Sequence, residues 1–113
     1  MATATFVQEG RAIDYTPTAN VAAGDVVVQG DMVGVARSPI SANTPGSLAV
    51  AGVFDFPKAT GAGSGIAVGA KVYWDVADVH AKTDDETGAN KLLGKTTKAA
   101  ADADATVRVR LTP

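Results

Sequence analysis

The sequence predicts an all-β fold, either a small β-barrel or a β-sandwich, with short turns and at most one short helical turn. The clearest observation is an alternation near the C-terminus, where Val107, Val109 and Leu111 point inward and the residues between them point outward. Gly30-Asp31 is a strong short-turn pair between two β-branched runs. The Ala-rich residues 98–105 are the one helix candidate, and they are long enough for a turn or two at most.

The first half of the chain consists of predicted strands separated by turn residues. We expect an extended segment over 5–8, a strand over 11–16, a hairpin made by 25–29 and 32–36, a surface loop over 38–47 and the longest strand over 48–56. This longest strand should bend near Gly52 and carry Phe54 and Phe56 on one face. Pro57 should end it.

The second half of the chain holds its only Trp. Ile66 and Val68 share a face by alternation, and residues 72–74 predict a further strand. In that strand Tyr73 and Trp74 should anchor the core or an interface, because an aromatic side chain buries roughly 150–250 Å². The remaining expected elements are an exposed glycine-rich loop over 60–65, a return strand over 79–82, an acidic turn over 83–88, and strands over 91–96 and 105–111.

Composition narrows the classes of function. A chain of 113 residues predicts a single domain. A net charge of -2 argues against a general nucleic-acid binder that works by neutralising phosphates. The apolar runs are far shorter than the ~20 residues of a membrane span, and the N-terminus lacks the pattern of a signal peptide, so we expect a soluble product of the cytoplasm.

No catalytic constellation emerges from the sequence. The chain has no Cys and a single His, His80, so neither a His-pair metal site nor a Cys–His nucleophile can be assembled. Asp84, Asp85 and Glu86 lack the spacing of a calcium loop and predict a solvated turn. We therefore expect a protein that is not an enzyme and that needs no metal or cofactor.

Residues 89–96 match the loose pattern of a phosphate loop, which ends in Gly94, Lys95 and Thr96. The surroundings disagree with that interpretation. Residues 82–88, where a buried strand should precede the loop, are polar and acidic, and only 17 residues (113 minus 96) remain for the helix and sheet that should follow. We interpret the match as a chance one, within an edge strand around 92–94.

Six short motifs follow one another in a recognisable order. They are Phe6-Val7-Gln8-Glu9-Gly10, then Ala23-Gly24-Asp25-Val26-Val27 with Val33-Gly34-Val35-Ala36, Gly52-Val53-Phe54-Asp55-Phe56-Pro57-Lys58, Gly69-Ala70-Lys71-Val72-Tyr73-Trp74-Asp75, Leu92-Leu93-Gly94, and Val107-Arg108-Val109-Arg110-Leu111. In this order and spacing the chain resembles the DUF2190 family of small phage and prophage proteins, the capsid cement or decoration proteins, over nearly its whole length. Some members of that family carry RecA/RadA recombinase-like names, and residues 89–96 suggest how such a name could arise.

The resemblance implies a structural role. A protein of this kind is an all-β module that binds the outer surface of the major capsid protein lattice and stabilises the head, often as a symmetric homo-oligomer such as a trimer. It would belong to the virion after synthesis in the host bacterial cytoplasm. The family brings no catalytic, metal or cofactor residues, and no nucleic-acid, membrane or small-molecule partner.

The N-terminal residues have two interpretations. Residues 1–8 form an extended arm ahead of a single β domain over 9–113, and Phe6, Val7 and Gln8 then contact a partner by adding to the edge of a sheet. Alternatively, residues 5–8 are the first strand of the β domain itself.

Two other classes of function stay open. One is an intracellular β-barrel binding module that acts on nucleic acid through Arg108 and Arg110. The other is a nucleotide-binding, recombinase-type component that rests on Gly94, Lys95 and Thr96 alone. The sequence does not identify the phage, the lattice site, the number of subunits or the role of the 61–65 loop.

Overall fold

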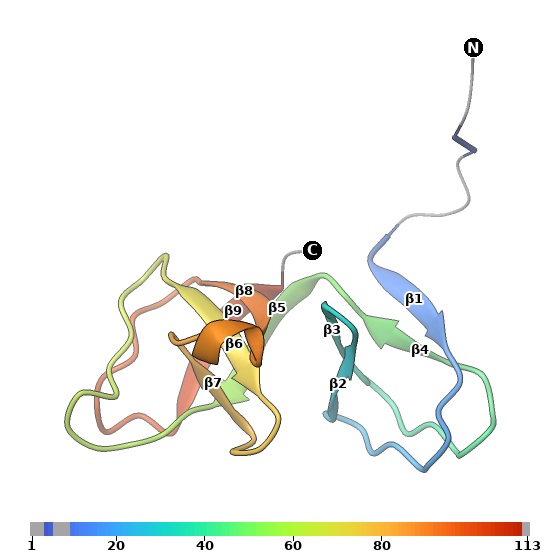
Figure 1. Cartoon of the computed structure of the whole chain (residues 1–113), viewed down its shortest axis with the longest axis horizontal. Coiled ribbons are helices and arrows are strands. Elements are labelled where there is room, and N and C mark those ends of the chain that lie inside the picture. Colours follow the sequence, from blue (N-terminus) through green and yellow to red (C-terminus); the bar gives the residue numbers. More distant parts are fainter. Residues whose placement is uncertain (1–3, 6–9, 112–113) are drawn as a thin grey trace.

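Two antiparallel β-sheets lie side by side in the computed structural model, which describes residues 4, 5 and 10–111 (Figure 1). The first sheet has the order β1-β4-β3-β2, with β1 (Ala12–Tyr15), β2 (Val26–Gln29), β3 (Met32–Val35) and β4 (Gly46–Ala49). The second has the order β5-β9-β8-β6-β7, with β5 (Gly52–Pro57), β6 (Lys71–Asp75), β7 (His80–Lys82), β8 (Lys91–Thr96) and β9 (Thr106–Leu111). The all-β prediction is confirmed.

Of the two architectures that the sequence allowed, the sandwich-like one is present. Over residues 10–111 neither sheet closes on itself, so there is no closed barrel in this part of the chain. The five-stranded sheet curls until its edge strands β5 and β7 approach each other, without forming a ladder. Helical structure in this range is limited to the 3-10 turn η1 (Glu86–Gly88), so it contains no helix long and apolar enough to cross a membrane.

A shared hydrophobic core joins the two sheets. Val33 and Val35 of β3 belong to the same buried cluster as Phe56, Trp74 and the inward side chains of β9. The predicted alternation in β9 is confirmed, because Val107, Val109 and Leu111 are buried and Thr106, Arg108 and Arg110 are exposed. Trp74 packs against Phe56 with ring centroids 6.0 Å apart and the rings tilted by 57°, so Trp74 anchors this core as expected. Tyr73, its neighbour in β6, is half-buried and is not part of that core.

The other face of the four-stranded sheet has its own small core. Val27, which points away from Val26 and Val28, packs with Leu48 and Ile40 under the loops. A single bridge between Val21 and Ile40 ties those loops together. The predicted surface loop over 38–47 is therefore partly a covering layer of the core, and its last two residues already belong to β4.

The predicted hairpin around Gly30-Asp31 is confirmed, with Gln29 opposite Met32. The prediction of one long strand over 48–56 is wrong. The apolar run is divided between β4 in one sheet and β5 in the other, with the crossing at residues 50–51. Gly52 begins β5 with φ +117°, a backbone conformation that residues with a Cβ rarely adopt. The chain changes sheets here instead of bending within one.

Two further expectations are wrong. Ile66 forms only an isolated bridge with Ala100, and Val68 is exposed, so 66–68 is not a strand and the two side chains do not share a buried face. Residues 98–105 contain no helix, because Ala100 is held by that bridge and the carboxylate of Asp104 accepts the N–H of Ala101. The one helical turn of the described residues lies in the acidic turn instead.

Candidate functional site

Gly94, Lys95 and Thr96 lie inside β8, which pairs with β6 on one side and β9 on the other. The expectation of an edge strand is wrong, since the edges of this sheet are β5 and β7. Thr96 is only 4% exposed, and its hydroxyl donates to the carbonyl of Ala67 (2.6 Å) and accepts the N–H of Ala70 (3.0 Å). A phosphate loop needs free backbone N–H groups at a strand-to-helix turn; these residues are part of a sheet ladder.

The predicted contact residues Phe6, Val7 and Gln8 lie outside the described residues. His80 begins β7 and is half-buried. Within residues 10–111, together with 4 and 5, no group of three or more His, Cys, Asp or Glu side chains is placed to hold a metal ion. Three surfaces of the described residues have a defined chemistry.

The first surface is the turn between β6 and β7, residues 76–79, which we call the hairpin tip. It presents two apolar side chains to solvent, Val76 at 62% exposed and Val79 at 57%. Val79 has φ +56°, in the left-handed region that β-branched residues avoid. Strained exposed positions persist only where the surroundings fix them, and they concentrate at functional sites.

Asp75, the residue before the hairpin tip, holds the tip in place through hydrogen bonds. Its side chain is 5% exposed, one carboxylate oxygen accepts the N–H of Asp78 (3.0 Å), and its carbonyl accepts the N–H of Val79 (2.8 Å). The other carboxylate oxygen accepts the ammonium of Lys82 at 2.8 Å. The hydrogen bond from Lys82, with that from Asp78, lowers the pKa of the Asp75 carboxyl, and the same bond to Asp75 raises the pKa of Lys82.

An acidic flank accompanies the hairpin tip. Lys82 also contacts the carboxylates of Asp78 and Glu86, the latter at 3.8 Å, so the tip and the acidic turn share one cation. Asp84 and Asp85 of the same turn are exposed. Three carboxylates around one ammonium, with two more beside them, give this end of the molecule a net negative charge.

The second surface is a hollow where the chain passes from β4 to β5, which we call the arginine groove. It has a volume of about 440 Å³ and is lined by Arg11, Ala12, Arg37, Ser47, Ala49, Ala51 and Gly52. Small apolar side chains form much of its lining, and two arginines, Arg11 and Arg37, take part in it. No carboxylate is among the lining residues, and the described part of the chain shows no acidic partner for Arg11 or Arg37.

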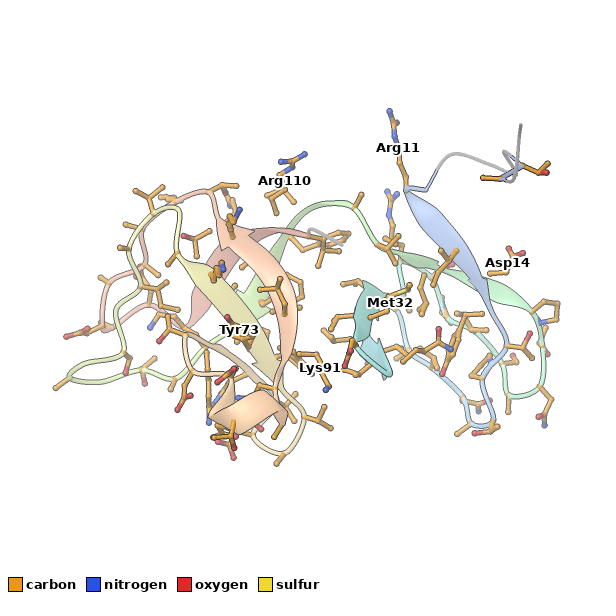
Figure 2. All side chains as sticks on the ribbon, turned by 45° about the horizontal axis from the view of Figure 1, so that its top comes forward. Arg11, Asp14, Met32, Tyr73, Lys91 and Arg110 are labelled. Atoms are coloured by element: carbon orange, nitrogen blue, oxygen red, sulfur yellow. The ribbon has the colours of Figure 1, made fainter. Side chains whose placement is uncertain are left out.

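The third surface crosses the outer face of the five-stranded sheet. Lys71, Lys95 and Arg110 are direct cross-strand neighbours on β6, β8 and β9, and we call them the basic row. Over the described residues none of the three has an ion-pair partner. Figure 2 shows Arg110 projecting from this sheet on the same side of the molecule as Arg11 projects from the other sheet.

Arg108 differs from its neighbour Arg110. Its guanidinium binds both carboxylate oxygens of Asp55 on β5, at 2.9 and 3.2 Å. This bond lowers the pKa of the Asp55 carboxyl and raises that of Arg108. Of the two arginines on which the nucleic-acid interpretation rests, one is therefore engaged by a carboxylate within the chain.

Sequence reasoning did not find the hairpin tip or the arginine groove. Asp75 and Asp78, spaced to form a side-chain-capped turn, could have indicated the tip. The groove has no local signal, because Arg11, Arg37 and Ala51 come from three distant parts of the chain.

Comparison with known proteins gives one clear result. A family model described as phage cement protein matches residues 7–111, which is nearly the whole chain. The searches of curated proteins and of solved structures return no match. Because the family match extends over both sheets and all three surfaces described above, the chain belongs to the phage cement protein family.

Proposed function

We propose that this protein binds the outer surface of an assembled phage capsid and stabilises the head as a structural, non-catalytic component of the virion. The observation that carries the proposal is the family match over residues 7–111. From the six motifs given above we also propose that the chain is a member of the DUF2190 family, and we expect it to be made in the host bacterial cytoplasm.

The mechanism that this role requires is linkage. A protein that binds the assembled lattice and not the separated subunits stabilises the lattice by mass action. Weak contacts repeated around a shell add up to a large effect, because neighbouring attachments raise the effective concentration of one another. No nucleic acid, membrane or small molecule has a part in such a mechanism.

The basic row is our candidate for the surface that faces the major capsid protein. Lys71, Lys95 and Arg110 lie in line on a broad sheet face, and their charges repel one another in the isolated protein. An acidic surface of the lattice would relieve that repulsion and accelerate encounter.

Residues 1–8 are proposed to act as an arm outside a single β domain over 9–113, with Phe6, Val7 and Gln8 as contact residues. An extended segment gains main-chain hydrogen bonds when it adds to the edge of a neighbouring sheet. We further propose a homo-oligomer, with a trimer favoured, because closed rings repeat one contact around a symmetry axis.

The decisive experiment compares purified particles that lack the protein with particles reloaded with the full-length chain or with a chain lacking Met1 to Gln8. Rupture by heat or low salt is followed in each sample. We expect full protection by the complete chain and weaker protection by the truncated one, while the melting temperature of the truncated protein changes little. Equal rupture in all samples refutes the cement function; equal protection by both chains refutes only the arm.

A nucleic-acid-binding module is the second candidate, since the basic row could follow a phosphate backbone. Such binding weakens steeply with salt, with a slope that reports the number of phosphates neutralised. A fluorescence titration with single- and double-stranded DNA tests it, and ATP titrated in parallel tests the recombinase-type alternative. Binding of either ligand at physiological salt would favour these alternatives over a purely structural role.

A further inference from the structure

We propose that the hairpin tip of one copy of this protein docks in the arginine groove of a second copy. This inference rests on the proposed self-association of the protein, and it specifies which two surfaces form the contact between copies. The tip belongs to the β6–β7 hairpin of the five-stranded sheet, whereas the groove lies where the four-stranded sheet passes into β5.

The two surfaces match in polarity. The tip offers Val76 and Val79 as an apolar pair, and the groove offers Ala12 and Ala51, with the buried Ala49 also in its lining. A cavity of about 150 Å³ accommodates a benzene molecule, so a hollow of about 440 Å³ has room for two valine side chains. Burial of this pair on both sides removes apolar surface from water without disturbing either fold.

They also match in charge. The tip is flanked by Asp78 and by the acidic turn, and the carboxylates there outnumber the ammonium groups of Lys82 and Lys91 that contact the turn. Arg11 and Arg37 are among the lining residues of the groove, and no carboxylate is. Guanidinium groups bind carboxylates through paired, charge-assisted hydrogen bonds, which strengthen when water is excluded.

Preorganisation lowers the cost of this contact. Asp75 already holds residues 76–79 through two N–H groups and the Lys82 ammonium, so little backbone freedom remains to be lost on docking. The positive φ of Val79 goes with the turn that its N–H closes onto the carbonyl of Asp75, and it leaves the side chain exposed. In a docked pair this exposed side chain enters the groove of the second copy.

The two surfaces lie at opposite edges of the molecule (Figure 1), which suits a heterologous contact. In Figure 1 the loop between β6 and β7 lies at the lower edge of the molecule, and the connection from β4 to β5 lies at the upper edge. A surface at one end that binds a surface at the other end repeats from copy to copy, and it gives a closed ring when the rotation closes. An isologous pair would instead make the tip-to-groove contact twice about a two-fold axis and would stop at a dimer.

Site-directed cross-linking tests the contact directly, because the chain contains no Cys. Val79→Cys places a thiol on the tip, and Ser47→Cys, nearly isosteric, places one in the groove. Val76→Cys serves as a second tip position should Val79→Cys unfold. Single variants and an equimolar mixture are treated with a short thiol cross-linker, in concentrated solution and on reloaded particles.

We expect a cross-linked dimer from the mixture of tip and groove variants, and little from either variant alone. Arg11→Glu with Arg37→Glu in the groove chain should reduce that yield at least tenfold, and Asp84→Lys with Asp85→Lys in the tip chain should restore much of it. High salt should lower the yield of the unmodified pair.

Three results would overturn the inference. The first is that cross-links form only within single variants. The second is that no tip-to-groove cross-link forms in solution or on particles. The third is a tip-to-groove cross-link that appears only after Met1 to Gln8 are removed, because the groove would then bind the chain's own N-terminus. Particle protection is measured on the same samples. Protection of particles without the cross-link refutes the contact and leaves the cement function intact. A cross-link without protection refutes the cement function and leaves the contact intact.

Discussion

The ammonium of Lys82 lies 2.8 Å from a carboxylate oxygen of Asp75, its near neighbour across the β6–β7 hairpin. Asp75 is the last residue of β6 and is buried, yet it also caps the turn that follows through the N–H of Asp78. One carboxylate thus joins the sheet, the turn and the acidic flank. Its loss should loosen the turn that presents the two strongly exposed valines of the hairpin tip.

Asp75→Asn is expected to lower the melting temperature by several degrees at pH 7, because the amide keeps the turn acceptor but leaves Lys82 without its buried counter-charge. Asp85→Asn is the matched control, since the Asp85 side chain makes no hydrogen bond among the described residues. Thermal unfolding followed by circular dichroism measures both. Equal melting temperatures for the two variants would contradict the role given to Asp75.

The same pair predicts a dependence on pH. The Asp75 pKa is lowered in the folded state, so its stabilising contribution is fully present above the unfolded value of ~3.9 and is lost as the pH falls through the lower folded value. The difference in melting temperature between the natural protein and Asp75→Asn should be constant from neutral pH to about pH 5 and should shrink below ~3.9. A difference that persists unchanged in strong acid would show that charge is not its origin.

Phe56→Ala should strongly destabilise the core that the two sheets share. Phe56 is 2% exposed and its ring makes tilted contacts with Trp74 and Phe54, with centroids 6.0 and 6.2 Å away. Truncation of a buried Phe costs about 3–5 kcal/mol of unfolding free energy. Val53→Ala, on the exposed face of the same strand, should stay within about 0.5 kcal/mol. Urea denaturation gives both values, and a small effect at Phe56 would mean that the shared core does not hold the sheets together.

Gly46→Ala tests the second core. A Cβ at Gly46 would lie 2.8 Å from three side-chain carbons of Ile40, which is itself buried against Leu48. Overpacking of this kind costs about 1–3 kcal/mol. Gly10→Ala is the control, because nothing lies within 4 Å of its added Cβ. Unfolding free energies from urea denaturation measure both effects. If the two substitutions lower stability equally little, Ile40 can move aside and the loops pack only loosely on the sheet.

Local patterns were sufficient for some elements and insufficient for others. The alternation of β9 and the Gly30-Asp31 hairpin were predictable, because side-chain direction and turn preference are decided within a few residues. The change of sheet at residues 50–52 was not. Leu48 and Phe56 belong to one apolar run, and only the different partner strands, β1 for β4 and β9 for β5, decide that the run is divided.

The missing helix over 98–105 has a similar cause. Alanine favours helix, but Asp102 accepts the N–H of Gly65 at 2.6 Å and Asp104 accepts that of Ala101 at 2.8 Å. Aspartate side chains compete with a helix for backbone N–H groups in this way. The bridge between Ala100 and Ile66 further holds this segment in a non-helical conformation. The arginine groove was unpredictable because only the folded chain brings Arg11 and Arg37 to the same hollow.

Lys95→Glu is the last prediction, and it separates stability from function. The introduced carboxylate would stand between Lys71 and Arg110 on neighbouring strands and replace two repulsive cross-strand pairs by two attractive ones. Each opposite-charge pair contributes roughly 0.2–1 kcal/mol, so the variant should be more stable than the natural protein in urea. Lys95→Gln, which removes the repulsion without adding an attraction, should give about half of that gain.

Attachment to particles should change in the opposite direction. If the basic row faces an acidic lattice, Lys95→Glu weakens binding in a co-sedimentation assay, and the loss is largest at low salt because exposed charges are then least screened. Lys98→Glu makes the same change of net charge outside the row and should bind nearly as well as the natural protein. If Lys95→Glu is stabilised and still binds fully, the basic row is not part of the interface. If it is destabilised, the three cations are not close enough to repel one another. A variant that is more stable but binds particles weakly would show that the basic row lowers the stability of the isolated protein and is needed for binding to the capsid.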